Sequence, residues 1–233
     1  MKKIFLSTVI FLLIALGCSK EKKSLDNRQG KAESEYLPFN DEKYQSGAQI
    51  IPGKVYCAYY DFGGEGVAYH DADSINQGSG KLNPDDGSYL HTFRMKEGVD
   101  ISYTKENIDD SEYNFFQPPM DLLYVGWTVP GEWLNYTVNV VQSGIYNVSL
   151  LYTSNQGGKI SLSVNGKQAT PFLTLFSTFN QNDKMASRQW HHWYLIENLA
   201  LIKLEKGIHV LTLTTEETGQ MNYAYLDFKL ETF

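Results

Sequence analysis

Apolar and polar residues alternate along much of the chain after residue 130. The stretch 133–140 reads WLNYTVNV, and its apolar residues at 134, 136, 138 and 140 are separated by polar ones. The same period of two runs through GIYNVSLLYTS at 144–154 and KISLSV at 159–164. A period of two is typical of a β-strand that buries one face. The pattern therefore predicts three strands in succession.

Shorter strand-like stretches lie on both sides of these three, with turn residues between them. Asn165-Gly166, directly after KISLSV, is a strong hairpin signal. No stretch after residue 18 has a helical period of useful length. Many short strands with Gly-rich turns predict an all-β sandwich or barrel, formed by one domain. The further strands are expected at 54–61, 66–69, 88–94, 99–104, 170–176, 190–195, 199–204, 208–215 and 223–230.

The charge of the chain excludes one class of partner. The 233 residues carry a formal net charge of -7. Nothing in them resembles a basic stripe, which a nucleic-acid-binding protein needs in order to neutralise phosphates. The 16 tyrosines and 12 phenylalanines favour a β-rich chain, because aromatic side chains fit a half-buried pleated surface. We therefore expect an acidic, all-β body that binds no nucleic acid.

Residues 1–18 differ in kind from the rest of the chain. Two lysines precede an apolar run over 4–16, which is too short to span a bilayer comfortably and leads into LIALGC at 13–18. This pattern predicts a signal peptide. Its end resembles the lipobox of bacterial lipoproteins, in which the cysteine, here Cys18, is lipidated and becomes the first residue of the mature chain. The alternative is an ordinary signal peptide with a coincidental cysteine.

The residues after Cys18 extend this expectation. Ser19 rather than aspartate indicates, in such lipoproteins, passage to the outer membrane. We therefore expect a protein of the cell envelope whose only membrane contact is its N-terminal lipid. Residues 19–48 are rich in Lys, Glu, Ser, Asn and Gln and are expected to form a flexible tether to a domain at 49–233. Cys57, the second cysteine, is expected as a small buried residue within a strand.

A Pro-Gly turn stands between two tryptophans in VGWTVPGEWLNYTVNV at 125–140. Other distinctive stretches are IPGKVYCAYYDFGGEGVAYHDAD (51–73), FRMKEGVDI (93–101), SGIYNVSLLYTSNQGGKISLSVNG (143–166), QWHHW (189–193) and MNYAYLDFKL (221–230). In this order the set resembles the carbohydrate-binding modules of family 6. The resemblance covers roughly Gln49 to Phe233. The tryptophan-flanked stretch and the ordered set are specific together, whereas any one stretch alone is a weak signal.

The resemblance implies a β-sandwich jelly roll of the galactose-binding-domain-like type, with a binding cleft among the loops at one edge. In that cleft two aromatic rings clamp a sugar and an asparagine bonds its hydroxyls; these positions fall on Trp127, Trp190 and Asn222. The chemistry agrees, because indole rings match the axial C–H face of a pyranose and an amide both donates and accepts hydrogen bonds. Trp133 and Trp193 are expected in the core.

Many members of the family bind a structural calcium ion, through acidic side chains of the first strand and an aspartate of the last. Here Tyr56 and Ala58 occupy the two positions where glutamate is usual, and Asp227 matches the late aspartate. Calcium takes six or more oxygen ligands. Asp227 alone is therefore a poor site, and no other cofactor is expected.

Three functions remain open at this point. The first is a non-catalytic, lipid-anchored module that stacks a plant or algal polysaccharide or oligosaccharide between Trp127 and Trp190 and holds it for separate glycoside hydrolases. The second is a protein-binding or structural envelope lipoprotein whose cleft is closed by an insertion at 172–187. The third is a glycoside-active enzyme, which needs two carboxylates across the cleft, and the acidic residues show no such spacing. His191 and His192 abut the cleft but, as neighbours, are not expected to share a metal ion.

Overall fold

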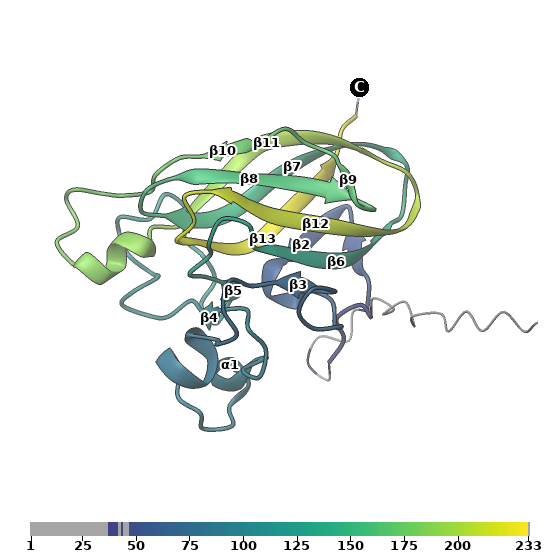
Figure 1. Ribbon diagram of the computed structural model, residues 1–233. Coiled ribbons are helices and arrows are strands. Elements are labelled where there is room, and N and C mark those ends of the chain that lie inside the picture. The colour runs from purple at the N-terminus through teal and green to yellow at the C-terminus, as the bar shows by residue number, and fades with distance from the viewer. Residues whose placement is uncertain (1–36, 42, 44–46, 233) are drawn as a thin grey trace, which may run out of the picture. The chain divides into compact units, whose positions relative to one another are not determined.

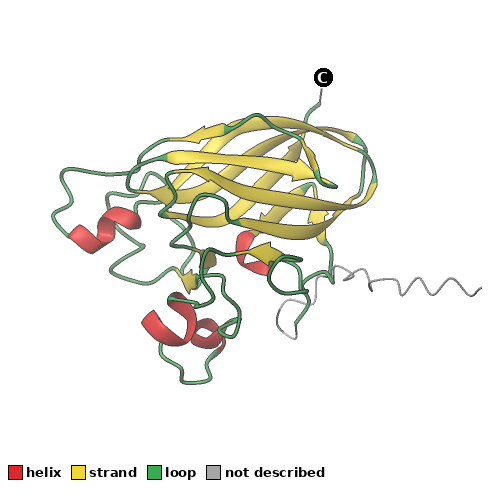
Figure 2. Ribbon diagram, viewed as in Figure 1, coloured by secondary structure: helices red, strands yellow, loops and turns green. Residues whose placement is uncertain are grey.

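The computed structural model describes residues 37–41, 43 and 47–232. The expected signal peptide, Cys18 and most of the expected tether lie outside these residues. Strands predominate within them and the helices are short (Figure 2). None of the helices in this part of the chain is long and apolar enough to cross a membrane.

The described residues form two β-sheets, which Figure 1 shows as the two layers of a sandwich. The first has the order β1 (Gln49–Ile51), β6 (Trp133–Val140), β12 (Gly207–Glu217), β8 (Gly158–Val164), β10 (Leu173–Leu175), with β3 (Tyr69–His70) on β6 and β9 (Lys167–Gln168) on β8. The second has the order β11 (Tyr194–Leu204), β7 (Gly144–Ser154), β13 (Met221–Leu230), β5 (Leu123–Val125), β4 (Ile101–Tyr103), with β2 (Gly53–Tyr56) on β13. This architecture confirms the expected β-sandwich jelly roll.

The strand alternation seen in the sequence fills the space between the sheets. Every second residue of β7 from Tyr146 to Tyr152 is buried in one apolar cluster with Leu211 and Leu213 of β12. Burying a large apolar side chain contributes about 1.5–3 kcal/mol. The predicted hairpin is also present, because Val164 pairs with Lys167 across Asn165-Gly166, where both turn residues have positive φ. The loops at the sandwich ends therefore start from a fixed scaffold.

The long loop between β4 and β5 covers part of the outer face of the second sheet, where Phe116 and Leu122 pack on it. Trp193 is fully buried beneath this loop, as expected of a core residue. Its carbonyl accepts hydrogen bonds from the N–H groups of Phe115 and Phe116, each at 2.9 Å. Its indole Nε1 donates to Asp109 Oδ1 at 2.7 Å. Trp193 thus fastens the loop, and Asp109 with it, to the end of the sandwich.

The segment 88–94 is a helical turn and not the expected strand. α1 (Tyr89–Thr92) follows Ser88, whose carbonyl accepts hydrogen bonds from the N–H of Thr92 at 3.0 Å and from its Oγ1 at 2.8 Å. These local bonds outweigh the strand propensity of tyrosine and threonine. A second turn, η2 (Gly78–Leu82), packs against α1 in the same segment between β3 and β4.

Further strand predictions are wrong in extent. The segment expected as a strand at 66–69 is a turn that enters β3 only at Tyr69. The first expected strand ends at Tyr56, where the 3₁₀ turn η1 (Cys57–Tyr59) begins. Cys57 is buried as expected, but in this turn, and burial raises the pKa of its thiol to about 12. The two strands expected at 190–195 and 199–204 are one strand, β11, interrupted by an irregularity at which Asn198 has a φ of 55°.

The folded body takes in part of the segment expected as a tether. Phe39 is only 2% exposed and stacks on Tyr59 with ring centroids 4.9 Å apart. Leu37 forms a bridge with Phe62. Burial of the Phe39 ring orders the residues around it. The charged and polar composition of residues 19–48 did not indicate this order.

Candidate functional site

Loops at one end of the sandwich enclose an open cavity of about 330 Å³. The structure brings Trp127, Trp190 and Asn222 together around it, although they come from the turn after β5, from η3 (Ala186–Trp190) and from the start of β13. The cavity is lined by Tyr124, Trp127, Ser187, Trp190, His191, Gln220 and Asn222. His191 was expected to abut the cleft, whereas Tyr124, Ser187 and Gln220 are lining residues that the sequence did not single out.

Trp127 has an unusual backbone conformation that sets the direction in which its side chain leaves the backbone. Its φ is 50°, in the left-handed region that bulky residues rarely adopt. The next residue holds this geometry, because Thr128 Oγ1 donates to the carbonyl of Met221 and accepts from its N–H, both at 3.1 Å. The Thr128 carbonyl also accepts from Gln220 N–H at 2.6 Å. The turn that carries Trp127 is thereby locked to the β12–β13 hairpin, which carries Gln220 and Asn222.

Trp190 is fixed through its backbone and leaves its ring accessible. Its carbonyl accepts hydrogen bonds from Thr153 Oγ1 at 2.6 Å and from Asn222 Nδ2 at 2.7 Å. The residue is 38% exposed. Strands β7 and β13 therefore position the residue without using the indole, which remains available to a ligand.

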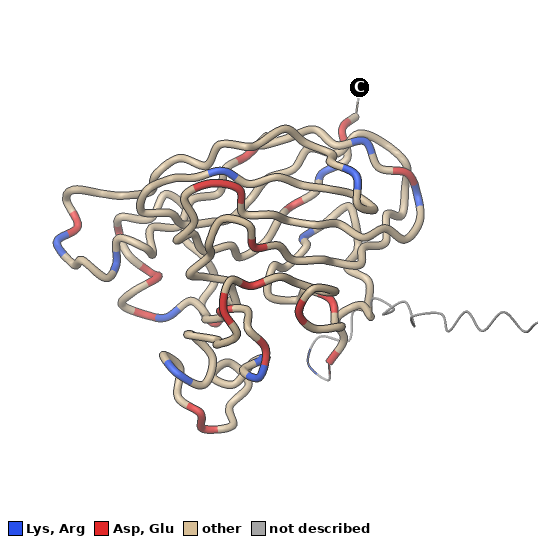
Figure 3. The backbone as a smooth tube through the Cα atoms, viewed as in Figure 1, with Lys and Arg blue, Asp and Glu red and all other residues tan. Residues whose placement is uncertain are grey.

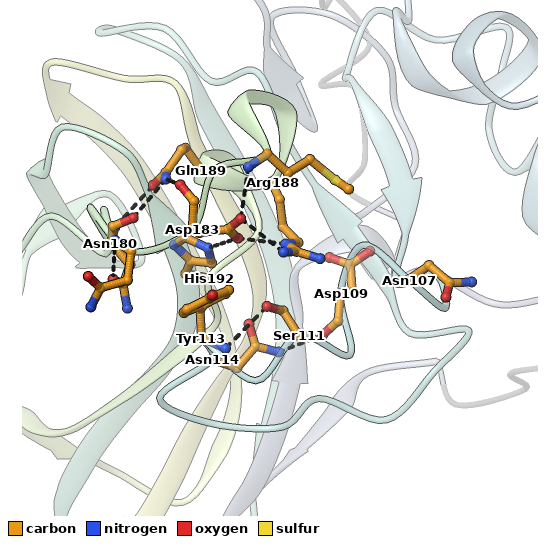
Figure 4. Close-up of polar contacts among 12 residues, drawn as sticks. Asn107, Asp109, Ser111, Tyr113, Asn114, Asn180, Asp183, Arg188, Gln189 and His192 are labelled. Atoms are coloured by element: carbon orange, nitrogen blue, oxygen red, sulfur yellow. Dashed lines mark hydrogen bonds and ion pairs between the residues drawn. The ribbon is translucent and has the colours of Figure 1, made fainter.

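A buried ion-pair network supports the segment that leads into Trp190 (Figure 4). Asp183 is 4% exposed and accepts hydrogen bonds from Arg188 Nε at 2.6 Å and from His192 Nε2 at 2.8 Å. The bond from Arg188 holds the pKa of the Asp183 carboxyl well below its usual range. Gln189 Nε2 donates to the carbonyls of Asn180 and Asp183 at 2.8 and 2.9 Å. The network gives the insertion a defined shape beside the cavity.

The insertion at 172–187 contributes one residue, Ser187, to the lining, and it leaves the cavity open. Its exposed aromatic side chains, Phe172, Phe176 and Phe179, are outside the lining set. The second of the three functions requires this insertion to close the cleft. The structure instead shows the cleft open.

The NH₂ group of the Asn222 amide is used in hydrogen bonds within the protein. Its Nδ2 donates to Trp190 O and also to Thr153 Oγ1, the latter at 2.9 Å. Because the Trp190 carbonyl can only accept, this orientation of the amide is fixed. Oδ1 lies against Gly126, where an added Cβ would be 2.6 Å from it. Only the acceptor side of Asn222 therefore remains for a ligand.

His191 and His192 turn to different partners, as expected of adjacent residues. His191 is in the cavity wall, and its Nδ1 is 2.9 Å from Asp109 Oδ1. His192 is fully buried in the Asp183 network. Tyr124 packs edge-on against His191 with ring centroids 6.4 Å apart, and burial raises the pKa of its phenol well above the usual range.

The acidic residues of the described chain form neither a hydrolase pair in the cavity nor a metal site. No Asp or Glu is among the residues that line the cavity. Within the described residues, no three or more His, Cys, Asp or Glu side chains form a group that could hold a metal ion. Asp227 Oδ2 is 3.9 Å from Lys229 Nζ and its register partner on β2 is Lys54. The residues present do not fit a calcium ion, because this aspartate lies among lysines.

Trp133 is not a core residue, contrary to expectation. It is half-buried and lines a shallow hollow of about 650 Å³ on the outer face of the first sheet, with polar neighbours that include Asn135 and Thr212. The alternation that began at Trp133 places its side chain on the face of β6 that points away from the other sheet. In the described part of the chain, Lys and Arg are interspersed with Asp and Glu and form no basic stripe (Figure 3).

Residues 101–232 match the family model described as carbohydrate binding module (family 6). The chain is similar to a solved CBM6 domain from Clostridium stercorarium in complex with cellobiose, at 11% identity over 80% of this chain and 99% of that one, with a TM-score of 0.48. It is also similar to a β-1,3-glucan binding CBM6 from Bacillus halodurans, at 13% identity over 78% and 98%, with a TM-score of 0.44.

A third similar structure is a carbohydrate binding module from Cellvibrio mixtus lichenase 5A in complex with cellotriose, at 18% identity over 58% of this chain and 88% of that one, with a TM-score of 0.40. No curated protein matches the chain. The family match begins at residue 101. It therefore leaves out the first part of the domain, which contains η2 and α1, although the sequence resemblance had extended to that part.

Proposed function

Because the chain belongs to carbohydrate-binding module family 6, a family of non-catalytic modules that bind carbohydrate, we propose that it binds a polysaccharide or oligosaccharide by stacking sugar rings between Trp127 and Trp190. The observation that carries the proposal is the meeting of these two indoles and Asn222 around one open cavity. In this arrangement the indoles cover the faces of a pyranose, and the Asn222 amide bonds a hydroxyl at its edge. Binding of this kind needs no catalytic group.

Preorganisation of the walls supports the proposal. The backbone of Trp127 is held by Thr128, and that of Trp190 is held by Thr153 and Asn222. A wall that is ordered before the ligand arrives avoids the entropic cost of ordering it on binding. The open cavity and the 38% exposed Trp190 favour this function over a protein-binding lipoprotein with a closed cleft.

We also propose that Cys18 carries a lipid, which would anchor the module at the outer membrane of a bacterial cell envelope. In this role the module would hold polysaccharide close to separate glycoside hydrolases. The support is the sequence pattern of residues 1–18 and the charged stretch after it. Metabolic labelling with a palmitate analogue tests the anchor: incorporation that Cys18→Ala abolishes supports it, and unchanged incorporation contradicts it.

Glycan binding is tested with the full chain that follows Cys18. Isothermal titration calorimetry against cellohexaose, laminarihexaose and xylohexaose covers the neutral β-linked backbones. Two of the similar structures named above are complexes with cellobiose and cellotriose, and the third is described as β-1,3-glucan binding. We expect binding to at least one glycan of this class and its loss in Trp127→Ala. No binding to these or to the parent polysaccharides, or binding indifferent to Trp127, overturns the proposed function.

A further inference from the structure

We propose that His191, held by the buried carboxylate of Asp109, is a specificity-determining residue of the cavity. It presents a hydrogen-bond acceptor, so the cavity selects the hydroxyl groups of uncharged sugars and rejects carboxylated or sulfated ones. This inference rests on the proposed function, since it concerns which sugars the same cavity accepts.

The buried carboxylate is positioned by three N–H donors. Asp109 is 0% exposed, and its Oδ1 accepts from Trp193 Nε1 at 2.7 Å while its Oδ2 accepts from Lys105 N–H at 2.8 Å. The third donor is His191, whose Nδ1 is 2.9 Å from Oδ1. An ionised carboxylate can only accept, so Nδ1 of His191 carries the hydrogen in its bond to Oδ1.

The tautomer of the neutral ring follows from this bond. With its hydrogen on Nδ1, the neutral imidazole has a lone pair at Nε2 and can only accept there. His191 Nε2 has no hydrogen-bond partner among the described residues, and the ring is one wall of the cavity. A ring flip would place a carbon against Asp109 and forfeit the bond, so the carboxylate fixes the orientation as well as the tautomer.

A second acceptor stands in the same cavity. Both hydrogens of the Asn222 amide are used by Trp190 and Thr153, which leaves Oδ1. A sugar hydroxyl can donate to Nε2 and to Oδ1, whereas a carboxylate or sulfate has only lone pairs to offer. No Lys or Arg lines the cavity to compensate such an anion. Leaving a polar group without its partner in this way lowers affinity about ten- to a hundredfold.

The discrimination depends on the charge of His191, so the groups that face the ring matter. Asp109 faces it from the loop between β4 and β5, and Tyr124 from β5. The two nearby cations are engaged elsewhere: Arg188 bonds Asp183, and Lys105 Nζ bonds Asn83 and Ser102.

The tautomer is tested directly by NMR on the full chain that follows Cys18. Two-bond ¹⁵N–¹H correlations of the imidazoles, assigned by comparison with His191→Gln, distinguish the two neutral forms. We expect the Nδ1–H form for His191, and a downfield proton on Nδ1 that disappears in Asp109→Asn. An Nε2–H form in the free protein overturns the inference, whether or not any glycan binds.

Selectivity is tested by calorimetry with cellohexaose and laminarihexaose, each compared with its C6-carboxylated form at about pH 8, above the ordinary pKa of histidine side chains. We expect the neutral form to bind at least about tenfold more tightly. His191→Phe should weaken binding of the neutral sugar and bring the ratio towards one.

The matched variant His191→Gln keeps a polar side chain, and thermal melting of both variants reports on folding. Equal binding of neutral and carboxylated sugars by the unaltered protein, or a ratio that neither variant changes, overturns the role of His191 and leaves the proposed function in place. No binding of any neutral glycan is the failure of the proposed function itself.

Discussion

Replacing Trp190 by alanine removes the most exposed aromatic wall of the cavity without touching the bonds that position it. Those bonds run from Thr153 Oγ1 and Asn222 Nδ2 to the carbonyl of Trp190 and not to its indole. The variant is therefore expected to fold like the parent protein. Its loss of affinity should report the contact between the ring and the sugar.

The size of the effect follows from the surface that the ring exposes. Trp190 is 38% exposed, which for a side chain of about 250 Å² leaves about 95 Å² for a ligand to cover. At about 25 cal/mol per Å², complete coverage contributes about 2.4 kcal/mol, and coverage of half contributes about 1.2 kcal/mol. Trp190→Ala is thus expected to raise the Kd about eight- to sixtyfold.

The assay is calorimetric titration with the neutral hexasaccharide that binds most tightly. Phe172→Ala is a matched control, because Phe172 is an exposed aromatic residue at 51% that is outside the cavity lining. The control should leave the Kd unchanged. A Trp190→Ala protein that melts like the parent and binds within about twofold of it would refute the stacking argument.

Three more predictions test other parts of the site and the fold. Gly126→Ala should weaken glycan binding more than tenfold while the protein still folds, because the added Cβ would be 2.6 Å from Asn222 Oδ1. Unchanged affinity in calorimetry would show that the ligand does not use Oδ1. Thr128→Val removes both bonds to Met221 and should lower the free energy of unfolding by about 1–3 kcal/mol in urea titrations, and a change below about 0.5 kcal/mol would contradict the lock described for the Trp127 turn. Burial raises the pKa of Asp100 and of Glu132 to about 7, so the folded state binds their protons more tightly than the unfolded chain does. Stability should therefore rise by the order of 2 kcal/mol as the pH falls from about 8 to about 5.5, and a fall over that interval would contradict the assignment.

The sequence predicted those parts of the fold in which one local pattern decides the outcome. The alternation in β6, β7 and β8 specified which face of each strand is buried, and Asn165-Gly166 specified the hairpin between β8 and β9. At 88–94 local propensity pointed to a strand, but bonds from Thr92 to the Ser88 carbonyl gave a helical turn. Such bonds depend on side-chain geometry that residue types do not reveal.

The candidate site was predictable to the extent that a motif marked it. Trp127, Trp190 and Asn222 were placed by resemblance, and the structure puts them around one cavity. Asp109 was missed because it lies in a loop far from His191 in the sequence, and only the burial of Trp193 brings that loop to the cavity. A long-range contact of this kind leaves no periodic signal in the chain.

The left-handed backbone at Trp127 has a consequence for how fast a sugar binds. A residue with a φ of 50° and a neighbour bonded to Met221 and Gln220 has few alternative conformations to visit. The free protein then spends most of its time in the binding-competent shape, so few encounters with a sugar are lost to a misplaced ring. Differences in affinity among glycans should consequently appear in their dissociation rates, with association rates nearly uniform across the series.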